Sequence, residues 1–239
     1  MFGAVLVLLS ALLYVLHFAI FRDAHHLWIY LLGDIAFVPL EVLIVTLIIH
    51  QLLSRREKKT MLNKLNMVIG VFFNETGNEL LRRTTGFCGN AEAYFDLLKP
   101  KGNWGPPQFR DALRRASSID PQIDCRKGDL QELRNYLLEK RACLLRLLEN
   151  PNLLEHESFT DVLWAVVHLT EELAARDLSQ APPDTDAMHL AGDIKRAHVH
   201  TVAAWLEYMQ HLKSAYPYLF SLAVRQNPFD AAASPTITK

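Results

Sequence analysis

Charged side chains are scarce in the first part of this 239-residue chain and ordinary in the rest. Residues 1–53 hold one basic residue, Arg22, and three acidic ones, Asp23, Asp34 and Glu41. Residues 54–239 hold the other 24 lysines and arginines and 23 aspartates and glutamates, about a quarter of that stretch, which is typical of a water-soluble domain. The lack of charge in the first part therefore predicts a membrane segment joined to a soluble one.

The chain also lacks an excess of either charge and has few cysteines. Its formal net charge of -1 gives no electrostatic reason to expect nucleic-acid binding. Cys88, Cys125 and Cys143 are too far apart for a disulfide framework or a CxxC metal site, so we expect free thiols in a reducing compartment. Half of the residues are apolar, which argues against intrinsic disorder.

Two long apolar runs predict a transmembrane helical hairpin in residues 1–53, with spans at about 1–21 and 27–53. The first run has no charged side chain and is long enough, at about 1.5 Å per residue, to cross a hydrocarbon layer of roughly 30 Å. It lacks the basic n-region and the small-x-small cleavage site of a signal peptide. Because only residues 22–26 separate the runs, we expect two antiparallel neighbouring helices.

Basic residues predict the orientation of the hairpin. Arg22 is the only one in the link, whereas a basic cluster follows the second span. Lysine and arginine are retained on the cytoplasmic side, so we expect a multi-pass protein with both termini and the soluble part in the cytosol. Trp28 and Tyr30 are expected at the outer interface as aromatic anchors. The basic cluster consists of Arg55, Arg56, Lys58, Lys59 and Lys64.

Polar residues inside the spans are candidates for a function. Asp34 and Glu41 are seven residues apart, so they project from nearly the same helix face, and Pro39 between them can kink the helix. Intramembrane carboxyl groups often mark an ion or proton path, whereas the simpler interpretation is that they, like His17, pack between helices as hydrogen-bonding contacts. A conduit would need an oligomer, because two spans cannot enclose a pore.

Helical periodicity continues after the membrane segment and predicts an all-α fold, a two-span hairpin followed by a cytosolic helical domain. Apolar spacing predicts a juxtamembrane amphipathic helix over residues 54–85, continuing the second span. Glycine and proline mark residues 86–128 as a loop-rich connector, and residues 129–226 are expected to form a helical bundle with a flexible tail at 227–239. Asp184 or Thr185 is expected to cap the last long helix of the bundle.

Histidines and carboxylates recur at helical spacing on two of the predicted helices. His168 with Glu172, and His189 with Asp193, are each four residues apart, so two facing helices could supply four metal ligands. On both predicted helices, however, these residues lie on the face opposite the apolar residues. On the second helix, the same face also carries Arg196. Solvated helix faces therefore explain the pattern more simply, and the four residues remain metal candidates without an assigned ion.

Motifs for phosphate binding and for a serine nucleophile are missing: the chain has no GxxxxGK[ST], GxGxxG or GxSxG, and it has no HExxH zinc motif. We therefore expect no cofactor and favour a non-enzymatic function. A membrane-anchored scaffold or sensor would present its helical domain for self-association or for a protein partner. The alternatives are an oligomeric ion channel or proton-linked conduit using Asp34 and Glu41, and a helical metal-dependent enzyme.

Four segments together resemble a family of uncharacterised bacterial and archaeal membrane proteins with two N-terminal spans. The resemblance implies a location in the prokaryotic cytoplasmic membrane, and it transfers no activity and no catalytic or binding residue. The segments are LLGDIAFVPLEVLIVTLIIHQLLSRREK (31–58), KLNMVIGVFFNETG (64–77), LENPNLLEHESFTDVLWAVVHLTEEL (148–173) and YPYLFSLAVRQNPFD (216–230).

Overall fold

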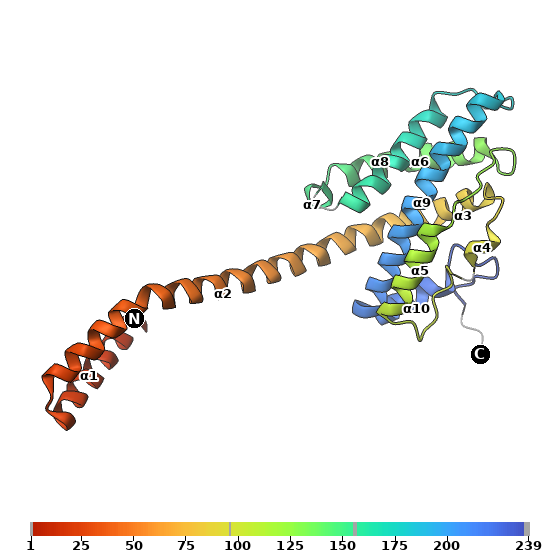
Figure 1. Cartoon of the computed structure of the whole chain (residues 1–239). Helices are drawn as coiled ribbons and strands as arrows, with labels where there is room; N and C mark the ends of the chain where they lie inside the picture. The colour runs from red at the N-terminus through yellow and green to blue at the C-terminus, as the bar shows by residue number, and fades with distance from the viewer. Residues whose placement is uncertain (1, 96, 155–156, 237–239) are drawn as a thin grey trace. The chain divides into compact units, whose positions relative to one another are not determined.

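The computed structural model describes residues 2–95, 97–154 and 157–236 (Figure 1). Helices dominate these residues, and their one piece of β-structure is an isolated antiparallel bridge between Cys88 and Ile123. The chain divides into two compact units, Met1–Thr60 and Met61–Lys239. The prediction of an all-α fold is confirmed.

The first unit is a helical hairpin of α1 (Phe2–Phe21) and the beginning of α2 (Ala24–Phe72). The link is two residues long, shorter than the five expected. Arg22 adopts a left-handed conformation (φ 51°), and its N–H donates to Phe18 O at 2.9 Å, which ends α1. Asp23 Oδ1 accepts the N–H of His25 at 3.0 Å and so caps the start of α2.

The apolar side chains of this unit are exposed. Two stretches, Gly3–Phe21 and Leu27–Gly86, are long and apolar enough to cross a membrane by length and composition, and the most apolar window of each has no buried residue. A core helix of a soluble protein would be mostly buried. Within the described residues, the most apolar windows of the two stretches are therefore not covered as a soluble core helix would be.

The long helix continues past the hairpin, as the periodicity predicted, and changes its winding within the second unit. After α2 come a π-helical turn, η1 (Phe73–Gly77), and α3 (Asn78–Gly86). The wider turn of a π-helix alters the backbone hydrogen bonding, and the carbonyl of Thr76 accepts the hydroxyl of Tyr136 from α6 at 2.8 Å. Gly77 leaves room for two aromatic rings, because a Cβ there would lie 2.6 Å from Phe73 Cδ1 and 2.7 Å from Phe72 Cε1.

The remaining helices form the bulk of the second unit. Asp129 Oδ1 accepts the N–H of Glu132 at 2.8 Å and caps the first helix of the predicted bundle. The helices are α4 (Glu92–Phe95), α5 (Pro106–Ser118), α6 (Leu130–Leu148), α7 (Pro151–Leu154), α8 (Glu157–Ala174), α9 (Asp184–Ala215) and α10 (Pro217–Arg225).

The start of α9 differs from the prediction. Pro183 occupies the N-cap position, and Asp184 and Thr185 lie inside the first turn instead of capping it. Pro183 has an extended backbone (ψ 152°), which directs the chain into the helix at the next residue. The Asp184 and Asp186 carboxylates in the first turn complement the positive end of the helix dipole without a capping hydrogen bond.

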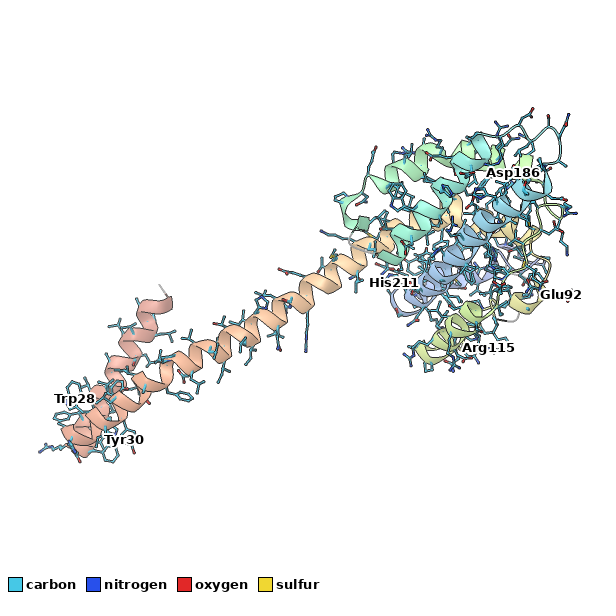
Figure 2. The ribbon with its side chains drawn as sticks, turned by 45° about the horizontal axis from the view of Figure 1, so that its top comes forward. Trp28, Tyr30, Glu92, Arg115, Asp186 and His211 are labelled. Atoms are coloured by element: carbon cyan, nitrogen blue, oxygen red, sulfur yellow. The ribbon has the colours of Figure 1, made fainter. Side chains whose placement is uncertain are left out.

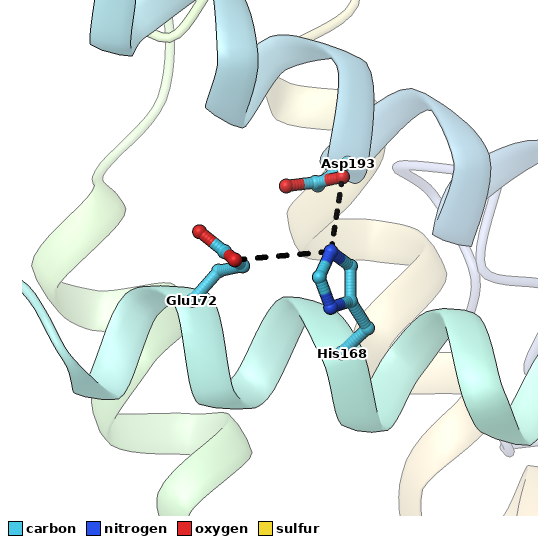
Figure 3. A group of neighbouring side chains, drawn as sticks. All are labelled: His168, Glu172 and Asp193. Atoms are coloured by element: carbon cyan, nitrogen blue, oxygen red, sulfur yellow. Dashed lines mark ion pairs between the residues drawn. The ribbon is translucent and has the colours of Figure 1, made fainter.

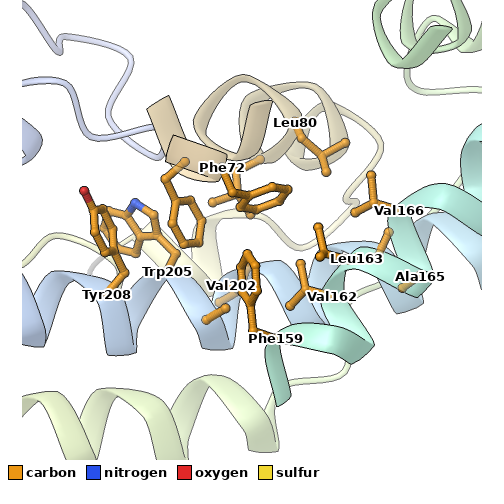
Figure 4. Close-up of a cluster of buried hydrophobic side chains, with 14 of the residues drawn as sticks. Phe72, Leu80, Phe159, Val162, Leu163, Ala165, Val166, Val202, Trp205 and Tyr208 are labelled. Carbon is orange, nitrogen blue, oxygen red and sulfur yellow. The ribbon is translucent and has the colours of Figure 1, made fainter. Parts of the chain in front are cut away.

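Helix α9 is the centre of the second unit, because α3, α5, α8 and α10 all pack on it. Aromatic side chains fill the space between α9, α8 and the end of α2 (Figure 4). The ring of Phe72 meets Phe159 edge-on at 5.3 Å, and Phe73 stacks on Tyr208 at 5.1 Å. Trp205, 1 % exposed, lies in the same cluster.

Residues 227 and 229, which were expected to belong to a flexible tail, are part of the core. Asn227 and Phe229 are buried, and Asn227 Nδ2 donates to Leu98 O at 2.7 Å. The Phe229 ring packs edge-on to Trp205 at 5.3 Å. The tail prediction is therefore wrong for these residues, because Asn227 and Phe229 close one end of the core.

Candidate functional site: a histidine and carboxylate cluster between two helices

Helices α8 and α9 bring together the four metal candidates identified in the sequence (Figure 3 shows three of them). His168 and Glu172 lie one turn apart on α8, and His189 and Asp193 lie one turn apart on α9. The two helices pack against each other, so both pairs face the same space. We refer to these four residues as the His/carboxylate cluster.

Each histidine of the cluster lies between the two carboxylates. His168 Nε2 is 3.5 Å from Asp193 Oδ1 and 3.9 Å from Glu172 Oε1. His189 Nε2 is 3.3 Å from Asp193 Oδ2 and 3.4 Å from Glu172 Oε2. Each ring therefore has one nitrogen atom close to an oxygen atom of both carboxylates, His168 to one oxygen of each carboxylate and His189 to the other.

The expectation of solvated helix faces is wrong for Asp193, holds only in part for Glu172, and holds for the two histidines. The Asp193 side chain is only 3 % exposed, and that of Glu172 is 26 % exposed, whereas those of His168 and His189 are 46 % and 54 % exposed. Asp193 Oδ2 is buried and accepts no hydrogen bond from the described residues. The prediction failed at Asp193 because α9 is covered on several sides, so the face opposite its apolar stripe is also in contact with protein.

Two arginines border the cluster and partly neutralise it. Arg176 donates to Glu172 Oε2 and makes a bidentate contact with Asp186, from Nε at 3.0 Å and Nη2 at 2.9 Å (Asp186 is labelled in Figure 2). Arg196 Nη1 donates to Asp193 Oδ1 at 2.9 Å. The hydrogen bond from Arg176 lowers the pKa of Glu172, and another lowers that of Asp186. With neutral histidines, three carboxylates and two guanidinium groups leave a net negative charge.

Another histidine, His198 on α9, is buried and was missed in the sequence. Its Nδ1 lies 2.9 Å from Thr84 Oγ1, and its ring meets Tyr94 edge-on at 6.0 Å. Burial lowers the pKa of His198 to about 4. The signal was present, because His198 lies four residues after Ile194 and four before Val202, both buried on α9.

The helical hairpin contains Asp34, Pro39, Glu41 and His17, the polar candidates that the sequence analysis expected inside the two spans. The Tyr14 hydroxyl of α1 donates to Asp34 Oδ2 of α2 at 3.2 Å. A cleft of about 920 Å³ between the two helices is lined by Asp34, Tyr14 and His17, together with apolar residues. Glu41 and Pro39 do not line this cleft, and Glu41 is exposed. Asp34 and Glu41 therefore have different surroundings, although their separation of seven residues predicted a common helix face.

The basic cluster lies on α2. Arg55, Arg56 and Lys64 are exposed there. The side chains of Lys58 and Lys59 lie outside the described part of the structure. The described members leave their charges available to solvent or to phosphate groups.

Cys88, Cys125 and Cys143 are free thiols, as expected, and the first two are buried. Burial raises the pKa of the Cys125 thiol to about 11, so it stays protonated near neutral pH. This thiol gives no sign of a reactive site.

Comparison with known proteins identifies relatives of the whole chain. Residues 61–225 match a family described as "Uncharacterized protein MJ1433, C-terminal helical domain", and residues 1–53 match "MJ1433, N-terminal helical domain". The uncharacterized protein MJ1433 of Methanocaldococcus jannaschii is 46 % identical over 226 residues, which cover 94 % of this chain and 90 % of that protein. No solved structure matches. The chain therefore belongs to the MJ1433 family of helical proteins.

Proposed function

We propose that this protein is anchored in the prokaryotic cytoplasmic membrane by its helical hairpin, and that its helical second unit binds another copy of the chain or a protein partner in the cytosol. The observation that carries the proposal is the exposed apolar surface of α1 and of the first part of α2. Such a surface is unfavourable in water and favourable in lipid.

The charges at the ends of the spans support the proposed orientation. The link has one basic residue, Arg22, whereas Arg55, Arg56 and Lys64 lie exposed on α2 after its apolar part. Trp28 and Tyr30 lie close to the link (Figure 2), where aromatic side chains suit the membrane interface. This arrangement favours an external link and a cytosolic second unit.

In this proposal, Asp34 stabilises the packing of α1 against α2. A hydrogen bond between Tyr14 and Asp34 joins the two helices where lipid offers no other partner. It satisfies one oxygen of a carboxyl group that would otherwise be costly in hydrocarbon.

The second unit has exposed apolar side chains suited to a protein interface. Trp164 on α8, Met188 on α9 and Tyr218 on α10 are 59 %, 68 % and 71 % exposed. Aromatic residues and methionine are enriched in interfaces relative to other surfaces. These three are the residues at which we expect contact with a partner.

Labelling of single cysteines with a membrane-impermeant maleimide tests the anchoring. In a variant with Cys143→Ser, His25→Cys is expected to react in intact cells. Ser214→Cys, which is exposed on α9, is expected to react only after permeabilisation. Extraction of the full chain by alkaline carbonate, or equal labelling of both positions in intact cells, would contradict the proposal.

Crosslinking in native membranes tests the partner. We expect crosslinked species in the wild type and their loss with Trp164→Ser or Tyr218→Ser, with Arg114→Ser on α5, whose side chain is 80 % exposed, as the control. If only monomers are found at every crosslinker length, the second unit binds no partner and that part of the proposal is wrong. The proposed membrane anchoring is tested separately, by the cysteine labelling.

A second candidate, an oligomeric proton-linked conduit, is favoured by Glu41. Its side chain is exposed on the hairpin, so in a membrane it would face lipid unless another copy covers it. Proton flux into proteoliposomes is expected to fall with Glu41→Gln and to persist with Tyr14→Phe. Absence of flux in the wild type at any pH or voltage would eliminate this candidate.

A further inference from the structure

We propose that the second unit binds a divalent transition-metal ion of the zinc class between α8 and α9, with His168, Glu172, His189 and Asp193 as its ligands. The proposal concerns the His/carboxylate cluster alone and does not depend on the membrane anchoring. Neither α8 nor α9 could form the site by itself, because each contributes one histidine and one carboxylate.

The spacing of the cluster matches that of a coordination shell. Zinc binds histidine nitrogen and carboxylate oxygen at about 2.0–2.2 Å, so two ligand atoms of a tetrahedral site lie about 3.4 Å apart. His189 Nε2 lies 3.3 and 3.4 Å from one oxygen of Asp193 and of Glu172, and His168 Nε2 lies 3.5 and 3.9 Å from the other oxygen of each carboxylate. Ligand atoms of His168, Glu172 and Asp193 all lie within 4.8 Å of one another. His189, whose Nε2 lies close to an oxygen of both Glu172 and Asp193, is the fourth ligand of the proposed site.

Asp193 supplies an independent reason for a cation at this place. Its side chain is 3 % exposed, and its Oδ2 is a buried oxygen that accepts no hydrogen bond from the described residues. A buried carboxylate oxygen in this state is unfavourable unless a positive group faces it. His189 Nε2 lies 3.3 Å from this oxygen, so an ion bound by both side chains would face it directly.

The donor atoms define the class of ion. Two imidazoles with two carboxylates suit zinc and the neighbouring divalent metals of the first transition row. Calcium and magnesium prefer shells made of oxygen, and copper(I) prefers sulfur. The two histidine side chains are about half exposed, so an ion can reach the carboxylates from solvent.

The arginines leave the ligand atoms available. Arg196 donates to Asp193 Oδ1 and leaves Oδ2 facing the cluster. Arg176 connects Glu172 to Asp186, which fixes the orientation of the Glu172 carboxylate as outer-shell partners of metal ligands commonly do. The competing explanation is an ion-pair network with protonated histidines and no metal.

Metal titration of the full chain separates these explanations. The protein, purified in detergent with a tag that lacks histidine and stripped with chelator, is titrated with Zn²⁺ by calorimetry and with Co²⁺ by visible absorption. We expect one ion per chain and an intense cobalt d–d band. His168→Gln, His189→Gln and Asp193→Asn are each expected to weaken Zn²⁺ binding at least ~10-fold. His200→Gln, elsewhere on α9, is the matched control and is expected to leave affinity unchanged.

Two results would overturn the proposal. One is a wild-type chain that binds no Zn²⁺ or Co²⁺ above the level of the triple variant His168→Gln/His189→Gln/Asp193→Asn. The other is a loss of affinity in His200→Gln equal to that in His168→Gln and His189→Gln. Because Asp193→Asn removes the partner of Arg196 and can reduce folding, the two histidine variants decide the question, with circular dichroism confirming their helix content.

Discussion

His198 is expected to make the stability of the second unit depend on pH. The ring is buried on α9, with Tyr94 and Thr84 against it. The Thr84 hydroxyl also lies 2.9 Å from Leu80 O, so when it donates its single hydrogen there it accepts the Nδ1–H of a neutral ring. The described structure shows no carboxylate paired with this ring, and burial therefore disfavours its charged form.

The size of the effect follows from the pKa values of the two states. Burial lowers the pKa of His198 from 6.5 to about 4 in the folded protein. Between these values the unfolded chain binds a proton that the folded protein does not, so the free energy of unfolding falls as pH falls below about 6.5 and levels off below about 4. The loss is about 2 kcal/mol between about pH 7.5 and about pH 5, and about 3 kcal/mol in full.

Urea unfolding of the full chain in detergent, followed by tryptophan fluorescence, measures this loss, because Trp205 reports on the core around α9. His198→Asn keeps an N–H near the Nδ1 position but does not titrate. The variant is expected to be less stable at neutral pH and to show a smaller loss on acidification, by about 2 kcal/mol at about pH 5. Equal acid-induced losses in the wild type and the variant would refute the assignment of a neutral, buried His198.

Four further substitutions test the packing and capping of the second unit by denaturant unfolding. Gly77→Ala is expected to lower the free energy of unfolding by about 1–3 kcal/mol, because its Cβ would lie 2.6 Å from one phenylalanine ring and 2.7 Å from another. Gly192→Ala, whose Cβ would have no atom within 4 Å, is expected to stabilise α9 by about 0.5–1 kcal/mol. Tyr136→Phe removes the 2.8 Å hydrogen bond to Thr76 O in the core and is expected to cost about 1–2 kcal/mol. Asp129→Ala removes the cap of α6 and is expected to cost about 1 kcal/mol.

Each of these changes has an outcome that would contradict its reasoning. Equal effects of the two alanine substitutions would mean that the rings beside Gly77 adjust without strain. No loss in Tyr136→Phe would mean that the Thr76 carbonyl gains nothing from the phenol. Asp129→Asn, which preserves an acceptor at the cap, is expected to remain close to the wild type, and a loss as large as that of the alanine variant would reject the capping role.

The helices could be predicted because their signals are local. Apolar spacing and proline positions located the two hairpin helices, the long continuation of the second and the break before α10 at Pro217. Their ends were less certain, as at Pro183, because a cap depends on the backbone conformation of one residue. The short link at Arg22 required a left-handed residue that sequence spacing does not reveal.

The four residues of the His/carboxylate cluster could be identified from the sequence, but their burial and their proximity to one another could not. Spacing placed His168 and Glu172 on one face of a helix, and His189 and Asp193 on one face of another. Whether those faces met solvent or each other depended on how α8 docks on α9, which is a long-range property of the fold. The same limit applies to His198, whose burial depends on α3 and on the segment around Tyr94.

The π-helical turn at Phe73–Gly77 has a consequence for how this chain tolerates change. A π-turn contains about one residue more than an α-helical turn, and one residue corresponds to about 100° of rotation around the helix axis. Because the wider turn takes up the extra residue, a deletion in η1 that restores regular winding would leave Leu80 and Leu81 of α3 facing the core, but would remove the turn whose Thr76 carbonyl accepts the Tyr136 hydroxyl. A one-residue deletion in η1 is therefore expected to be tolerated better than one in the regular winding of α3, where every later residue would turn by about 100° around the helix axis.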